Sequence, residues 1–150
     1  MDKEIIFRGK TINDNEWVYG LLLETSIKEY REYGSSSYIV RGCAKHDDNG
    51  WHFLSYLVEE ESIGQFTGLT DKNCNKIFTN DIVRITALGN DNHQKGAETI
   101  AVVEDYMGNT CLCIDGKHQT GTTLYEISIA HTVEVIGNIH DNPELITEVN

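Results

Sequence analysis

The chain has 150 residues, close to the commonest size of one domain and long enough to bury an apolar core without metals or disulfides. It carries 24 acidic and 12 basic residues, a formal net charge of -12, and acidic residues outnumber basic ones in both halves. Such a surface repels phosphate backbones and anionic lipid, which argues against direct binding to nucleic acid or to membrane surfaces.

The N-terminal segment, residues 1–8, lacks the apolar core of a signal peptide, and no apolar run is long enough to cross a bilayer. The four cysteines are neither dense nor regularly spaced, which is typical of free thiols in a reducing compartment. We therefore expect a cytoplasmic protein that folds as one domain over residues 1–150. A division into two β-lobes, about 1–60 and 61–150, is the alternative.

The N-terminal part reads as strands joined by polar turns. Apolar runs at 5–8 and 17–23 flank a polar loop and predict a first hairpin. Residues 25–34 fit a short helix, a strand or an irregular segment, and 34–37 predict a flexible connection. Runs at 38–41 and 51–58 predict two strands, and Asn49-Gly50 between them is a strong tight-turn signal.

The stretch from Ile63 to Val83 organises the rest of the chain. Two apolar runs, 63–69 and 77–85, flank a polar segment whose Asp and Asn residues favour a turn, so we expect two strands that fold back on each other. Further strands are predicted at 81–87, 98–106, 110–114, 121–129 and 133–138. Pro143 follows all of them, and Asn142-Pro143 predicts a short terminal helical turn. The pattern predicts an all-β fold of antiparallel sheets with at most one or two short helices.

Three ordered blocks of the sequence resemble the YopX family of bacteriophage and prophage proteins. They are Phe7-Arg8 with Trp17-Val18-Tyr19-Gly20, the central 63–83 stretch, and Val135 to Leu145. Cys74 and Asn80 stand where the family usually has glycine; Asn80 tolerates a positive φ, whereas Cys74 implies another turn geometry or a left-handed neighbour. The resemblance implies strongly coiled, barrel-like sheets in a protein of the bacterial host cytoplasm. It implies no activity and no functional residues.

One group of residues could bind a metal. Cys111 and Cys113 share a face of a predicted strand and His118 follows within a turn, so three soft ligands could begin a zinc site. Same-face neighbours on a strand lie roughly 7 Å apart, however, and the Cys-x-x-Cys spacing of structural zinc sites is absent. We therefore favour small buried apolar residues and predict no metal ligands.

The other candidates are better explained by structure. Asp81 could present a carboxylate at a strand end, but an aspartate that accepts backbone N–H bonds from its turn is the favoured interpretation. The run Glu59-Glu60-Glu61 predicts a solvated strand edge. The six histidines show no paired spacing, and no nucleophile elbow, phosphate loop or dinucleotide fingerprint is present. We therefore predict no catalytic or cofactor-binding residues, no cofactor and no enzymatic activity.

The leading hypothesis is an accessory protein of a phage or prophage that acts by binding a host or phage protein or by self-association as a homo-oligomer. The alternative is a nucleic-acid-related role, either as a β-barrel or as an acidic mimic of DNA. An enzyme would require His118, a cysteine and a carboxylate in one deep pocket.

Overall fold

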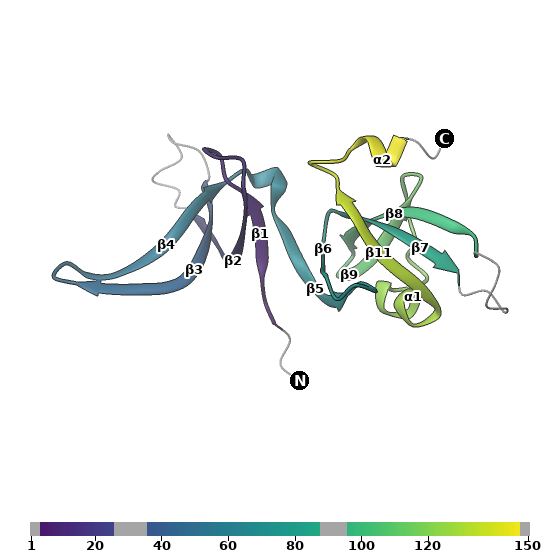
Figure 1. Cartoon of the computed structure of the whole chain (residues 1–150), viewed down its shortest axis with the longest axis horizontal. Helices are drawn as coiled ribbons and strands as arrows, with labels where there is room; N and C mark the ends of the chain where they lie inside the picture. Colours follow the sequence, from purple (N-terminus) through teal and green to yellow (C-terminus); the bar gives the residue numbers. More distant parts are fainter. Residues whose placement is uncertain (1–3, 26–35, 88–95, 148–150) are drawn as a thin grey trace. The chain divides into compact units, whose positions relative to one another are not determined.

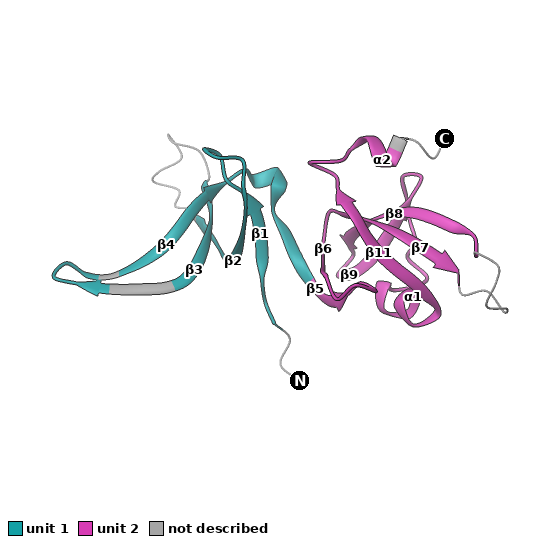
Figure 2. Ribbon diagram, viewed as in Figure 1, with its two compact units in different colours: residues 1–66 teal, residues 67–150 magenta. Residues whose placement is uncertain are grey.

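The computed structural model describes residues 4–25, 36–87 and 96–147, and the chain forms two compact units, 1–66 and 67–150 (Figure 2). Strands make up most of the described residues, and all the strand pairs are antiparallel (Figure 1). The all-β prediction is therefore confirmed at this level. Each unit is described separately below.

Unit 1 is built on β1 (Phe7–Lys10), β2 (Trp17–Thr25), β3 (Ser36–Asp47), β4 (Gly50–Val58) and the first part of β5 (Gly64–Thr70). The strand order is β4-β3-β2-β1-β5, and β1 pairs with β2 as the predicted first hairpin. A short 3-10 helix, η2 (Glu60–Ser62), precedes β5. The three glutamates at 59–61 are exposed but form this turn, so their prediction as a strand edge was wrong.

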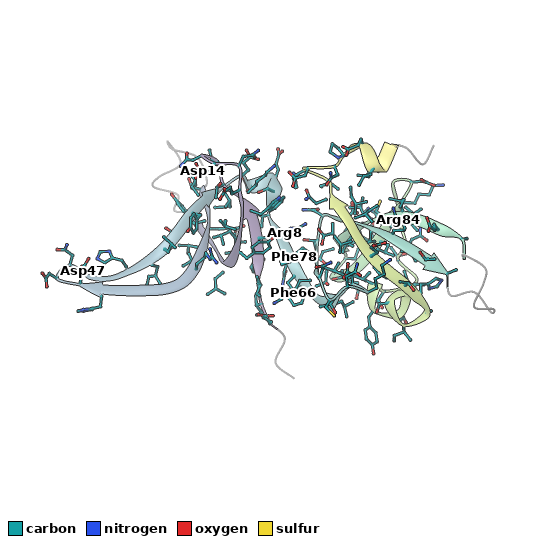
Figure 3. The ribbon with its side chains drawn as sticks, in the orientation of Figure 1. Arg8, Asp14, Asp47, Phe66, Phe78 and Arg84 are labelled. Carbon is teal, nitrogen blue, oxygen red and sulfur yellow. The ribbon has the colours of Figure 1, made fainter. Side chains whose placement is uncertain are left out.

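The β3–β4 hairpin is longer than predicted. Its register slips between Arg41 and Ala44, and pairing then continues to Asp47 opposite Gly50. The tip lies at residues 48–49 rather than 49–50: the backbone N–H of Asn49 donates to Asp47 Oδ1 at 2.8 Å, and Gly50 takes a φ of 109°. Figure 3 labels Asp47 at this tip. The bulge lies between residues 38–41 and the polar segment 45–47. The apolar pattern is therefore interrupted within β3.

Ser36 and Ser37 belong to β3, and Ser37 is buried, so the flexible connection expected there was wrong at these two positions. The rest of that connection and the 25–34 segment, except Thr25 at the end of β2, lie outside the described residues. Residues 88–95 also lie outside the described residues.

Unit 2 contains the sheet β10-β9-β8-β7-β11. Its strands are β7 (Asp81–Ala87), β8 (Glu98–Tyr106), β9 (Asn109–Ile114), β10 (Lys117–His118) and β11 (His131–Asn138). The chain enters this unit along β5, whose neighbour is β6 (Lys76–Phe78). The terminal helical turn predicted after Asn142 is confirmed as α2 (Glu144–Thr147).

The strand predicted at 121–129 was wrong, because the chain forms α1 (Leu124–Ala130) there. Thr123 Oγ1 accepts the backbone N–H of Glu126, and the Glu126 carboxylate accepts the N–H of Thr123, which is a complete capping box. Leu124 is buried in the core and Ile127 packs against it, the i, i+3 spacing of a helix face. A local cap and a helical period outweighed the β-propensity of the segment.

The two units bury cores of different size. In unit 2 eight buried residues form one cluster: Ile77, Val83, Ile85, Ala101, Val103, Leu112, Leu124 and Val133. In unit 1 the buried cluster has three members, Val18, Ile39 and Val58. Within the described residues, neither sheet pairs the first strand of its order with the last. Barrel-like closure and strong coiling are therefore not confirmed.

Candidate functional site

Three side chains that can bind metals converge on the face of the unit 2 sheet opposite its core. The hairpin β8–β9 pairs Val103 with Leu112, and both of these point into the core. Residues one position away therefore point outward. Pairing of β10 with β9 places His118 directly opposite Cys113, and Glu104 lies on the same outer face from β8.

The three ligand atoms lie close together. His118 Nδ1 is 2.9 Å from Glu104 Oε2, and Cys113 offers a sulfur such that all three atoms lie within 4.8 Å of one another. The Tyr106 ring stacks on His118, with ring centroids 4.1 Å apart and planes 14° apart. The tight turn between β9 and β10 supports this arrangement, because Asp115 and Gly116 take φ values of 49° and 70°.

The surroundings of Cys113 favour its protonated thiol. Burial raises the pKa of Cys113, the negative charge of Glu104 raises it further, and the thiol also forms a hydrogen bond with Glu104. A backbone hydrogen bond from Gly116 acts in the opposite direction. Without a cation the cluster is therefore a neutral thiol beside a carboxylate and an imidazole.

The sequence analysis identified two members of this group and missed the third. Cys113 and His118 come together, whereas Cys111 points to the same face but is not one of the three clustered ligands. Burial raises the pKa of Cys111, and the charges of Glu104 and Asp105 add to this shift. The missed residue is Glu104. The strands predicted at 98–106 and 110–114 contained the signal, since pairing them sets Glu104 opposite Cys111 and hence on the cysteine face.

A cavity of about 310 Å³ adjoins the cluster. Glu104 and Cys113 line it together with Asp115, and apolar side chains that include Ile139 and Ile146 line the rest. The cavity therefore gives a small molecule or water access to the thiol and carboxylate side of the group.

Asp81 has the structural role that its position predicted. It is almost fully buried, and its Oδ2 accepts the backbone N–H of Phe78 at 2.7 Å. Asn80 takes a φ of 70°, as expected of a residue in a glycine position. Cys74 itself takes a φ of 66°, so the alternative of a left-handed neighbour was wrong.

Asp71 is a structural residue that the sequence analysis did not single out. Its buried carboxylate accepts the backbone N–H groups of Asn73, Asn75 and Val135 at 2.8, 2.9 and 3.0 Å, and the Asn75 amide at 3.3 Å. Burial alone raises the pKa of Asp71, but these donors together lower it below its ordinary value. The residue joins the 71–75 turn to β11 across 64 positions of sequence.

A second contact between a histidine and a carboxylate lies at the tip of the β3–β4 hairpin, where His52 Nε2 is 2.8 Å from Asp47 Oδ1. Both side chains are more than half exposed. His52 and Asp47 are the same two ligand types as His118 and Glu104, but they are not grouped with a cysteine.

Neither helix in the described part of the chain has the length and apolarity that a membrane crossing requires. No curated protein matches the chain. Among solved structures it is similar to one titled as the crystal structure of protein EF1440 from Enterococcus faecalis, with a TM-score of 0.50 and 18% identity, covering 97% of this chain and 99% of that one. At this identity the likeness concerns the fold alone. The model of the family described as YopX protein matches residues 6–147, so the chain belongs to the YopX family.

Proposed function

We propose that this protein is a cytoplasmic accessory protein of a phage or prophage that works by association rather than by catalysis, and that its partner is a second copy of the chain. The observation that supports this is an exposed apolar sheet face on unit 1. We call it the β2–β4 face. It consists of apolar side chains on one side of three neighbouring strands, with the exposed Ser55 between the last two: Tyr19, Leu21, Leu23, Tyr38, Val40, Phe53 and Leu57.

The strand register places these side chains on one side of the sheet. Leu21 lies opposite Val40, and Leu23 lies opposite Tyr38, which in turn lies opposite Leu57. Directly opposed residues of antiparallel strands share a face. The three-residue core, with Ile39 at its centre, uses the intervening positions and therefore the other face. A sheet of a soluble protein usually has polar residues on its second face, so an apolar second face marks an interaction surface.

The exposed area is close to what a dimer needs. Leu21 is 60% exposed and Phe53 64%, and Tyr19, Leu23 and Leu57 are between 37% and 52% exposed. With roughly 200 Å² for each fully exposed side chain, these five leave roughly 500 Å² of apolar surface. Two such faces would bury roughly 1,000 Å², the lower limit of a specific interface, and the half-buried Tyr38 and Val40 enlarge it.

The chemistry of the face fits a second copy. None of the described side chains that define it is charged, and Arg8, which lies opposite Tyr19 on β1, is buried, so an identical face on another copy meets it without like-charge contacts at its centre. Two sheets can stack face to face as in a β-sandwich, with strand directions within about 30° of each other. The net charge of -12 per chain opposes association over longer distances, and salt screens that repulsion.

Sedimentation velocity over a range of protein concentrations tests the proposal, with a reducing agent present. We expect a monomer–dimer equilibrium at roughly micromolar concentration, strengthened by salt and shifted to monomer by Leu21→Glu or Phe53→Glu. The matched control is Ile129→Glu on α1, where the side chain is also 64% exposed but lies in unit 2. Circular dichroism confirms that each variant is folded.

A wild-type chain that stays monomeric at roughly millimolar concentration would refute self-association. So would a dimer that Ile129→Glu dissociates and Leu21→Glu does not. Capture of a different protein through the β2–β4 face by a monomeric chain would replace the second copy as the partner.

A further inference from the structure

The Glu104, Cys113 and His118 cluster has the composition and spacing of a zinc site. The three residues supply one oxygen, one sulfur and one nitrogen, all of which zinc accepts. Zinc binds these atoms at about 2.0 to 2.3 Å in tetrahedral geometry, which puts neighbouring ligand atoms about 3.3 to 3.8 Å apart. The ligand atoms here all lie within 4.8 Å of one another and come from three neighbouring strands, so small side-chain rotations suffice.

We propose that Glu104, Cys113 and His118 bind one Zn²⁺ through Oε, Sγ and Nδ1, with water completing the tetrahedron from the adjoining cavity. The sequence analysis predicted no metal ligands because Cys111 and Cys113 lie too far apart along one strand to share an ion. The carboxylate from β8 removes that objection, since Cys111 is no longer required.

The charge of the group suits a divalent cation. A thiolate and a carboxylate beside a neutral imidazole carry two negative charges, which one Zn²⁺ balances. The Cys113 sulfur and the Glu104 oxygen lie within 4.8 Å of each other, so a dication between them would attract both groups.

Binding rearranges two hydrogen bonds and releases a proton. The 2.9 Å contact between His118 Nδ1 and Glu104 Oε2 opens so that both atoms can face the ion. The Cys113 thiol, which is bonded to Glu104, loses its proton to solvent and its sulfur binds the metal as thiolate. Stacking of His118 on Tyr106 keeps the imidazole beside the site during this change.

A Co²⁺ titration of the reduced full-length chain tests the site, because Co²⁺ bound to a thiolate gives a charge-transfer absorption that oxygen and nitrogen ligands alone do not give. We expect one Co²⁺ per chain, with this absorption, and displacement of Co²⁺ by Zn²⁺. Cys113→Ser should abolish the absorption. Glu104→Gln and His118→Gln should each weaken Zn²⁺ binding by at least about tenfold, a loss in the range seen for groups that support a zinc site.

Two control variants keep the comparison matched. Cys74→Ser removes an exposed thiol of the same unit that is not one of the clustered ligands, and His52→Gln removes the imidazole of the carboxylate pair at the β3–β4 tip. Both should retain the Co²⁺ absorption and the Zn²⁺ affinity of the wild type.

A second measurement needs no variant of the ligands. In the Cys74→Ser chain, Zn²⁺ should protect Cys113 from alkylation, as measured by mass spectrometry of the peptide that contains it. Absence of thiolate-to-cobalt absorption in the wild type, or the same absorption in folded Cys113→Ser, would overturn the proposal. Alkylation of Cys113 that is unchanged by a saturating concentration of Zn²⁺ would do so as well.

Discussion

The two units of this chain differ in how the faces of their antiparallel sheets are covered. Unit 2 covers one face of its sheet with α1 and β6, and eight fully or nearly fully buried residues form a single cluster there. Among the described residues of unit 1, the buried cluster on one face has three members, and apolar side chains are exposed on the other face. Because burial of apolar area is the main source of stability, unit 2 carries more of its own stability than unit 1.

Ile39 and Ile77 offer the sharpest comparison between the two cores. Both are fully buried isoleucines, one in each cluster. Ile39→Ala and Ile77→Ala should each cost about 3 kcal/mol of unfolding free energy through lost burial and a residual cavity. In unit 1 that loss falls on a core of three residues, so its strands should lose hydrogen-exchange protection, whereas unit 2 should keep most of its protection in Ile77→Ala.

Hydrogen exchange followed by mass spectrometry, strand by strand, measures this difference. Ile5→Ala is the control, because Ile5 is 58% exposed in unit 1 and its truncation should change little. The comparison of the cores would be contradicted if the Ile77→Ala variant lost all protection in unit 2 while the Ile39→Ala variant kept its protection in unit 1.

Asp71 gives unit 2 a buried carboxylate that accepts three backbone N–H groups, whereas in unit 1 the buried Ser62 hydroxyl accepts one, from Lys10, and donates to the Glu59 carbonyl. Asp71→Asn should destabilise unit 2 by about 2 kcal/mol, because the amide lacks the charge that strengthens the bonds to three backbone N–H groups. Urea unfolding followed by exchange in β11 measures the loss. Asp14→Asn in the exposed β1–β2 loop should have no effect beyond error.

The same residue predicts a pH dependence. The donors lower the pKa of Asp71 in the folded state, so the unfolded chain binds more protons and stability rises with pH. The contribution is fully present above the ordinary aspartate value of 3.8 and is lost as pH falls through the lower folded pKa. The stability difference between wild type and Asp71→Asn should therefore shrink on acidification below that value. A difference that grows in acid would contradict the assignment.

The capping box of α1 is the smallest of these effects. Thr123→Ala should lower the stability of unit 2 by about 1 kcal/mol, because the backbone N–H of Glu126 loses its acceptor. Thr122→Ala is the matched control, since Thr122 is an exposed neighbour outside the cap. Equal losses from the two variants, measured by thermal unfolding, would show that the cap is not the source.

Local patterns predicted the fold well where neighbours along the chain decide it. The strands at 81–87 and 98–106 and the helical turn after Asn142 follow from alternation and capping. The segment at 121–129 was assigned to a strand although Thr123 and Glu126 already formed the sequence signature of a helix start. The β3 bulge, in contrast, depends on pairing with β4, which residue types alone do not specify.

The candidate zinc site could be predicted only in part. Cys113 and His118 could be grouped from the sequence because they are close along the chain. Glu104 lies on another strand, and its place beside them depends on the β8–β9 register. The exposure of the β2–β4 face depends on which face of the unit 1 sheet is covered. Alternation identified strands such as 17–23 but did not reveal that Leu21 and Leu23 stay uncovered, since both faces of these strands carry apolar residues.

The bond between Asp71 and Val135 also has a consequence for synthesis of the chain. The residues of unit 1 are synthesised before those of unit 2, so that unit can begin to fold early. Unit 2 needs β11 at the far end of the sequence to fill its core and to satisfy the Asp71 carboxylate. We therefore expect the apolar side chains of its first strands to stay exposed to chaperones until β11 has been synthesised.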